Sequence, residues 1–283
     1  MIKKNRFVFY IVLLITALLF DVSIVMAGAR TVRVAGSTTV LPVVAKTSDM
    51  FMAIHPDVRI MVNPGGSGVG VKFVGNGLAD IGMVSREITD EEIKNFPESD
   101  FKVNVVGIDA VACVVSSEIY DSGVKTLTKE QIRKIYSGEI ENWKYVGGPD
   151  KEIFCIDKER HRGTRHVFME YVFGNKNARA PGADLVSGSN NEEQTKVALS
   201  DKAIGMLSFA WINGDVKGVD IIEDGNIIAP TVVNIKNGRY PIARNLTLVT
   251  NGVAGGVIGE FIDYILGPYG QKVVEEYGYV SVK

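Results

Sequence analysis

Short apolar segments alternate with longer amphipathic segments along most of the chain. In the first part, residues 31–35, 57–62 and 80–84 have the pattern of strands, and residues 39–54 and 67–74 follow two of them as amphipathic helices. Alternation of strand and helix favours an α/β fold in which the sheets are largely parallel.

Two capping boxes mark further helix starts, because Thr89-Asp-Glu-Glu92 and Thr128-Lys-Glu-Gln131 place an acceptor at the N-cap and a Glu or Gln three residues later. Between them, residues 103–115 form a long apolar stretch that is interrupted by Asp109. The rest of the chain continues the alternation, with strands predicted over 153–156 and 203–209, helices over 164–173 and 191–199, an extended segment over 240–250, and one or two helices over 257–277.

The N-terminus has the pattern of a secretory signal peptide. Lys3, Lys4 and Arg6 precede the apolar run 7–20, and Ala27-Gly-Ala29 then offers small residues for cleavage. The run is shorter than the ~20 residues of a spanning helix, so cleavage near Ala29 is favoured over an uncleaved membrane anchor. The sequence therefore predicts export to a periplasmic or other extracytoplasmic compartment, with residues 1–29 removed.

Composition and charge narrow the possible functions. The 283 residues fit one large or two medium domains, and the 31 basic and 33 acidic residues give a net charge of −2. Cleavage after Ala29 would leave 28 basic and 32 acidic residues, a net charge of −4, which gives no sign of a nucleic-acid-binding protein.

Cys113 and Cys155 are either two buried thiols or, after export, a disulfide. Neither they nor the three histidines have metal-site spacing, and no cofactor is predicted.

Three predicted junctions between a strand and a helix consist of small polar residues. They are Gly36-Ser37-Thr38-Thr39, Gly65-Gly-Ser67-Gly68 and Gly163-Thr164-Arg165. A helix N-terminus exposes unpaired N–H groups and partial positive charge, hydroxyls add donors, and glycine allows close approach of an anion. Any one junction could be an ordinary cap. Together, at the carboxyl ends of the sheets, they indicate a site for a tetrahedral oxyanion.

Arg86 and Asp109 are the charged candidates for this site. Arg86 ends the strand 80–84, and a guanidinium matches two oxygens of a phosphate group. A carboxylate within an apolar run needs a partner, which could be Arg86 or a protonated oxygen of the ligand. The second possibility would favour phosphate, which carries a proton at neutral pH, over sulfate.

The full set of motifs resembles one family. The motifs are Gly36-Ser-Thr-Thr-Val40, Gly65-Gly-Ser-Gly68, Asp80-Ile-Gly-Met-Val-Ser-Arg86, Ile108-Asp-Ala110, Gly163-Thr-Arg165, Ala203-Ile-Gly205, Tyr240-Pro-Ile-Ala-Arg244 and Gly270-Gln-Lys272 with Tyr277-Gly-Tyr279. In this order, across nearly the whole mature chain, they resemble the phosphate-binding component of ABC importers.

The resemblance implies a two-lobed periplasmic-binding-protein fold of type II. Each lobe would hold a mixed, mainly parallel sheet flanked by helices, with residues 30–112 and 245–283 in lobe I, 113–244 in lobe II, and two crossing strands as the hinge. It also implies a monomeric protein without enzymatic activity that delivers inorganic phosphate to an ABC permease. The ligand-binding residues carried over by motif are Ser37, Thr38, Thr39, Ser67, Arg86, Asp109, Gly163 and Thr164.

One segment departs from the family pattern, which has an Arg and, a few residues later, Ser-Gly-Thr. Here Lys158 stands at the Arg position, unless Arg160 takes that role, and Arg162 replaces the Ser. Arg162 would make the cavity more positive, so sulfate, molybdate and tungstate remain alternatives to phosphate.

Two other function classes stay open at this point. A phosphate-ester hydrolase would use Ser37 or Thr164 with His161 or His166 as base. A sensing module could use the same fold without transport.

Overall fold

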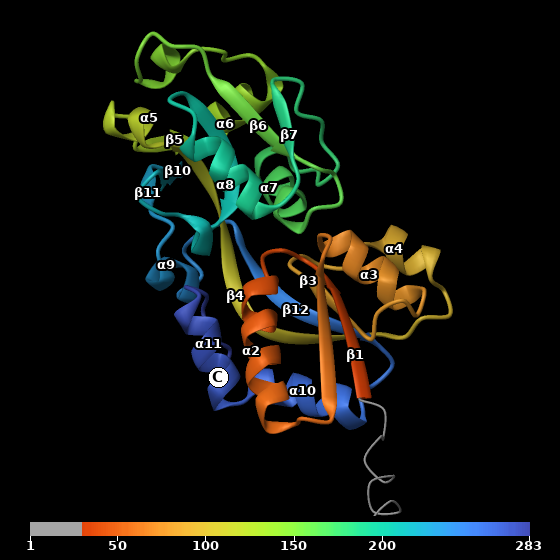
Figure 1. The fold of residues 1–283 in the computed structure, drawn as a ribbon. Helices are drawn as coiled ribbons and strands as arrows, with labels where there is room; N and C mark the ends of the chain where they lie inside the picture. The colour runs from red at the N-terminus through yellow and green to blue at the C-terminus, as the bar shows by residue number, and fades with distance from the viewer. Residues whose placement is uncertain (1–29) are drawn as a thin grey trace, which may run out of the picture.

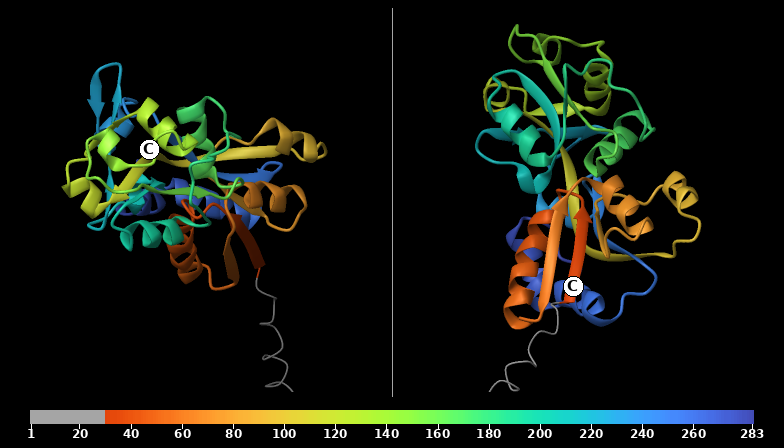
Figure 2. Two further views of the ribbon diagram at one scale, coloured as in Figure 1. Left: turned by 90° about the horizontal axis from the view of Figure 1, so that it is seen from above. Right: turned by 45° about the vertical axis from the view of Figure 1, so that its right-hand side comes forward.

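The computed structural model describes residues 30–283, which form two lobes (Figure 1). The predicted signal peptide and its cleavage point at Ala29 lie outside the described residues. Within 30–283, no helix is both long enough and apolar enough to cross a membrane. Figure 2 shows the same two lobes from two further directions.

Lobe I is built on a sheet in which β2, β1 and β3 are parallel neighbours and β12 and β4 complete the order β2-β1-β3-β12-β4. Its strands are β1 (Arg30–Gly36), β2 (Val58–Pro64), β3 (Ile81–Val84), the first part of β4 (Phe101–Ser116) and β12 (Ala243–Asn251). Its helices are α2 (Leu41–Ile54), α3 (Ser67–Gly75), α4 (Asp90–Asn95), α10 (Gly256–Leu266) and α11 (Pro268–Glu276). The core between α2, α10 and the sheet contains Val32, Phe51 and Phe261.

Lobe II continues the same sheet through β4, β8, β6 and β7, with β9 also paired to β4. Its elements are α5 (Ser117–Asp121), β5 (Thr126–Thr128), α6 (Lys129–Ser137), β6 (Phe154–Lys158), α7 (Gly163–Phe173), β7 (Leu185–Ser187), α8 (Asn190–Ala198), β8 (Ala203–Ser208), β9 (Val216–Gly218), β10 (Asp220–Glu223), β11 (Asn226–Ile228) and α9 (Val232–Lys236), with short 3₁₀ turns at Trp143–Val146 and Phe209–Trp211. Strands β11, β10 and β5 form a separate small sheet. Trp143, Tyr136 and Phe168 are buried in the core of this lobe.

Strand β4 connects the lobes. Its residues 101–110 pair with β12, whereas 111–116 pair with β8 and β9. The predicted apolar stretch 103–115 is therefore one strand that passes from lobe I into lobe II, and β12 returns beside it (Figure 1). The predicted α/β fold with mixed sheets and flanking helices is confirmed, and every antiparallel pair involves β4, β12 or the β10–β11 hairpin. The lobe boundaries at 112/113 and 244/245 stay a prediction.

Local sequence signals placed most helix starts correctly. Thr89 Oγ1 accepts from the Glu92 N–H at 3.1 Å, and Thr128 Oγ1 accepts from the Gln131 N–H at 3.1 Å, so both capping boxes are confirmed. The predicted segment 257–277 is two helices, which Gly267 separates.

The two cysteines are free thiols inside lobe II. Cys113 lies on β4 and Cys155 on β6, and both are buried. Burial raises the pKa of both thiols well above the ordinary value, so neither is a reactive thiolate at neutral pH.

Candidate functional site

The three predicted junctions meet between the lobes. They surround a cavity of about 10 Å³ whose walls come from the loop before α2, the starts of α3, α7 and α8, and the ends of β3 and β6. The residues that line it are Ser37, Thr38, Thr39, Gly66, Ser85, Lys158, Arg162, Gly163, Thr164, Gly188 and Asn190. Six of the nine predicted ligand residues are in this lining, and Ser67 lies directly behind it.

Two glycines allow the helix starts to come this close. Gly66, the N-cap of α3, has φ +92°, a backbone conformation that residues with a Cβ rarely adopt. A Cβ on Gly163, the first residue of α7, would lie 2.4 Å from Ser67 Oγ and 2.6 Å from Ser85 Oγ. The N-termini of α3 and α7 therefore face each other across the lobes only because both positions lack a side chain.

Three serine hydroxyls form a cluster on the lobe I side. Ser37 Oγ donates to Ser85 Oγ at 2.9 Å, and Ser67 Oγ lies 3.3 Å from Ser85 Oγ. Ser67 Oγ also accepts from the Ser85 N–H at 3.1 Å. Three strand ends of lobe I thus bring hydroxyl groups to one point, although Ser85 was not predicted as a site residue.

Asp109 pairs with Arg244, and the predicted alternative in which it pairs with Arg86 is wrong. Asp109 and Arg244 are directly opposite each other in the β4–β12 register. Arg244 donates from Nε and Nη2 to Asp109 Oδ2 at 2.9 and 2.7 Å, and Ser208 Oγ donates to Oδ1 at 2.9 Å. Burial raises the pKa of Asp109, while Arg244 and Ser208 oppose that shift. Asp109 does not line the cavity.

Arg244 is the main residue that the sequence reasoning missed. Its Nη2 donates to Thr39 Oγ1 of lobe I at 3.2 Å, and its Nη1 donates to Thr164 Oγ1 of lobe II at 3.1 Å. Nη1 also donates to the Ser85 carbonyl at 3.3 Å. A buried carboxylate at Asp109 required a cation, and that requirement was the available signal. Arg244 therefore positions predicted ligand donors of both lobes from the hinge.

Arg86 does not line this cavity. Its Nη1 and Nη2 donate to the Glu92 carboxylate at 2.8 and 2.7 Å, and Nη1 also donates to the Glu87 carbonyl at 2.7 Å. The guanidinium lies on the wall of a neighbouring groove. Because Glu92 follows six residues later on α4, a local ion pair holds the Arg86 guanidinium beside Gly68 of the second junction but outside the cavity.

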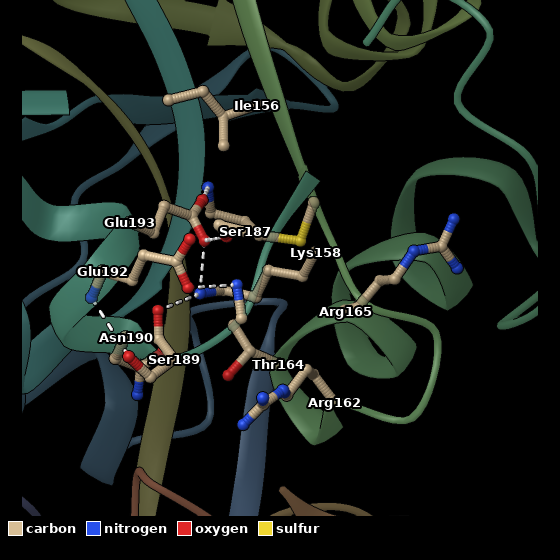
Figure 3. Close-up of polar contacts among 12 residues, drawn as sticks. Ile156, Lys158, Arg162, Thr164, Arg165, Ser187, Ser189, Asn190, Glu192 and Glu193 are labelled. Atoms are coloured by element: carbon tan, nitrogen blue, oxygen red, sulfur yellow. Dashed lines mark hydrogen bonds and ion pairs between the residues drawn. The ribbon is translucent and has the colours of Figure 1, made fainter. Parts of the chain in front are cut away.

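Lys158, which lines the cavity, forms a buried ion pair in its wall. Figure 3 shows its ammonium next to Glu193 of α8, and both side chains are almost fully buried. Burial lowers the pKa of Lys158 and raises that of Glu193, and each partner opposes the shift of the other. Ser187 Oγ and the Met206 N–H donate to the same carboxylate at 2.9 and 2.6 Å. This network fixes the start of α8.

Asn190 and Arg162 complete the rim of the cavity. Asn190 Nδ2 donates across the lobes to Thr39 Oγ1 at 2.9 Å, a contact that sequence reasoning did not anticipate. Arg162 donates from Nε and Nη2 to Glu159 Oε2 at 2.8 and 2.5 Å. The cation that replaces the expected serine thus has its own carboxylate partner.

A phosphate-ester hydrolase would require either a metal site or a hydroxyl beside a histidine base. Among residues 30–283, no three His, Cys, Asp or Glu side chains lie close enough to hold a metal ion. Ser37 Oγ is bonded to Ser85, and Thr164 Oγ1 accepts from Arg244. His161 Nε2 donates to the Gly65 carbonyl at 3.1 Å. The suggested pairs of hydroxyl and histidine are therefore not formed.

Comparison with known proteins places this arrangement among binding proteins. The family model described as a PBP superfamily domain matches residues 22–268. The phosphate-binding protein PstS of Bacillus subtilis is 31% identical over 256 residues, covering 90% of this chain and 82% of the relative. The phosphate-binding protein PstS of Borreliella burgdorferi is 30% identical and covers 99% of both chains.

Solved structures give the same result. A substrate-binding protein of Clostridium perfringens with bound phosphate is 32% identical to this chain, with a TM-score of 0.80. The match covers 90% of this chain and 100% of the chain from Clostridium perfringens. An ABC-type phosphate transport receptor of Vibrio cholerae is 30% identical to this chain, with a TM-score of 0.71. The match covers 88% of this chain and 99% of the receptor.

Proposed function

Because the chain belongs to the PBP superfamily and, within it, to the family of phosphate-binding proteins, we propose that it captures inorganic phosphate between its lobes and delivers it to the permease of an ABC importer. The N-terminal pattern supports export, with the mature protein acting outside the cytoplasm. The observation that carries the proposal is the convergence of three helix N-termini and a serine cluster, drawn from both lobes, on one small cavity.

The direct ligands that we propose are Ser37, Thr38, Thr39 and Ser67 from lobe I and Gly163 and Thr164 from lobe II, whereas Arg162 stays at the rim, paired with Glu159. The cavity has room for about one water molecule, so a phosphate requires its walls to move apart. The serine hydroxyls would then exchange their mutual hydrogen bonds for bonds to the anion. Asp109 would act through Arg244, and Arg86 would support α4 and the cleft wall rather than contact the same anion.

Contacts across the lobes support a closed state that binding would stabilise. The Gly68 N–H donates to the His161 carbonyl at 3.1 Å, and Asn190 donates to Thr39. Arg244 bonds to hydroxyls of both lobes from the hinge. Closure around a ligand and opening about β4 and β12 is the motion that such a two-lobed protein uses to present its cargo.

The same contacts support binding without catalysis. The hydroxyls that a hydrolase would need as nucleophiles, Ser37 and Thr164, are bonded to Ser85 and Arg244 and have no histidine base beside them. We propose that the chain returns its ligand unchanged.

Equilibrium dialysis of labelled phosphate against the chain from residue 30 tests the proposal. We expect saturable binding well below 1 mM, the concentration at which binding free energy is only about 4 kcal/mol. Thr164→Val should weaken it, whereas Thr195→Val on the exposed face of α8 should not, since Thr195 Oγ1 only donates to the Asn191 carbonyl. If sulfate or molybdate binds in preference to phosphate, that oxyanion and not phosphate is the ligand. If none of these oxyanions binds saturably, the proposed function is refuted.

A further inference from the structure

The short turn between β6 and α7, residues 159–162, lies against the opposite lobe beside the phosphate cavity. A Cβ on Gly66 would lie 2.9 Å from Arg162 Cδ and 3.1 Å from His161 Cδ2. A Cβ on Gly68 would lie 3.2 Å from His161 Cβ. The two lobes are therefore in direct contact at His161, a residue that is not part of the cavity lining.

His161 makes two hydrogen bonds from lobe II to lobe I. Its carbonyl accepts from the Gly68 N–H at 3.1 Å, and its Nε2 lies 3.1 Å from the Gly65 carbonyl oxygen. A carbonyl oxygen can only accept, so Nε2 must carry the hydrogen of the second bond. The main chain and the side chain of one residue thus hold both ends of the segment 65–68.

Contacts within lobe II hold the β6–α7 turn in this shape. The Arg162 N–H donates to the Glu159 carbonyl at 3.0 Å, and Arg162 Nε donates to Glu159 Oε2 at 2.8 Å. His161 Nε2 lies 3.5 Å from the same carboxylate oxygen. None of these contacts needs lobe I, so the turn should keep its shape when the lobes separate. It then loses little conformational entropy when they meet.

The two His161 bonds differ from the other contacts that cross the cleft. Asn190 Nδ2 and Arg244 Nη2 both donate to Thr39 Oγ1, which belongs to a proposed phosphate ligand. The Gly65 carbonyl and the Gly68 N–H are not proposed ligands. Bonds that form only when the lobes meet stabilise the closed form, and these two can persist while an anion occupies the cavity.

We propose that His161 is a latch, a residue that holds the two lobes closed over the bound anion and so sets how slowly phosphate leaves. The anion in this inference rests on the proposed function, whereas the latch depends only on contacts between the lobes. Phosphate enters the open form, in which His161 and Gly65 are apart, so the association rate should not depend on the latch. Release requires the bonds to break, and water can replace the side-chain bond because the His161 side chain is 43% exposed. Loss of one such bond should raise the dissociation rate about fivefold.

Three histidine variants of the chain from residue 30 test the latch. A chase of labelled phosphate by excess unlabelled phosphate gives the dissociation rate, equilibrium dialysis gives Kd, and their ratio gives the association rate. His161→Ala should raise the dissociation rate and Kd about fivefold and change the association rate less than about twofold. His161→Gln keeps a side-chain N–H donor and should restore most of the loss. His55→Ala, at the C-cap of α2, should match the unsubstituted chain.

Gly68→Ala tests the same contact from lobe I. Gly68 lies within α3 and has no positive φ, so alanine suits the helix and the urea midpoint of unfolding should not fall. The new Cβ, however, would lie 3.2 Å from His161 Cβ and 3.4 Å from the His161 carbonyl oxygen, which is tighter than ordinary contact. The lobes should therefore close less completely, and phosphate should dissociate at least about threefold faster. Unchanged release from this variant would contradict the latch.

The distance between two spin labels reports closure without reference to phosphate. Arg59→Cys on β2 and Leu199→Cys after α8 place the labels on exposed positions of different lobes, while Cys113 and Cys155 are buried and stay unlabelled. His161→Ala should lower the ratio of closed to open molecules about fivefold, and His55→Ala should not. If this shift occurs in a chain that does not bind phosphate, the latch stands and the proposed function fails. If His161→Ala alters neither closure nor release, or if His161→Gln behaves like His161→Ala, the latch is overturned.

Discussion

Replacement of Arg244 by Met tests whether the hinge ion pair holds the binding site together. Arg244 is 6% exposed and makes five hydrogen bonds, two of them to Asp109 and one each to Thr39, Thr164 and the Ser85 carbonyl. Met fills much of the same volume but leaves Asp109 as a buried carboxylate without its cation. Breaking a buried pair in this way costs about 3–5 kcal/mol of unfolding free energy. Thr39 and Thr164 also lose the group that positions them, so phosphate affinity should fall about tenfold or more.

Urea unfolding and equilibrium dialysis measure the two effects, and an exposed pair provides the control. Arg33 donates from Nε and Nη2 to Asp80 at 3.2 and 2.8 Å, but its side chain is 46% exposed. Arg33→Met should therefore cost at most about 1 kcal/mol. In the double variant Asp109→Asn/Arg244→Met, part of the loss should be recovered, because no charge is left unpaired. Equal costs at the two arginines, or additive costs in the double variant, would refute the reasoning.

Three further predictions concern the site and its surroundings. Thr164→Val should weaken phosphate binding in dialysis about tenfold, whereas Arg162→Ala, which removes a guanidinium already paired with a carboxylate, should change it less than about threefold. The pKa of His166 is lowered from 6.5 to about 4, so between these pH values the unfolded chain binds more protons than the folded chain. The contribution of His166 to the free energy of unfolding should therefore be full above pH 6.5 and be lost as the pH falls toward 4. His166→Leu should flatten this pH dependence in urea unfolding. Glu193→Gln should cost about 3–5 kcal/mol, since it leaves the Lys158 ammonium buried without a carboxylate, and a cost below 1 kcal/mol would contradict the buried pair.

Local signals were enough to predict most of the fold. The capping boxes at Thr89 and Thr128 fix helix starts through bonds between residues three apart, so they are visible in the sequence. The strand 103–115 was visible as an apolar run, because it is buried along most of its length. Short elements such as β5 and β7 were not predicted. A strand of three residues has no period of its own, and the neighbouring strands determine whether it forms.

The sequence predicted those parts of the site that lie within one strand-to-helix junction. It did not predict the side-chain pairs between residues that are far apart in the sequence. Glycine and hydroxyl residues after a strand identified the junctions at Ser37, Ser67 and Thr164. The partner of Asp109 lies 135 residues away on β12, so only the strand register brings Arg244 opposite to it. The direction of Arg86 followed from Glu92, whose capping role was recognised but whose carboxylate also binds the guanidinium.

The departure from the family pattern changes the charge of the site less than the sequence suggests. Arg162 stands where a serine is usual, yet Glu159 neutralises it, and Glu193 neutralises Lys158 in the same way. An anion in the cavity would thus meet paired cations together with amide and hydroxyl groups. Charge then contributes little to the choice between oxyanions, and hydrogen-bond geometry decides it. Hydroxyls both donate and accept, whereas amides only donate, so the serine cluster is where a proton on phosphate can be recognised and where sulfate, which carries none, should bind less well.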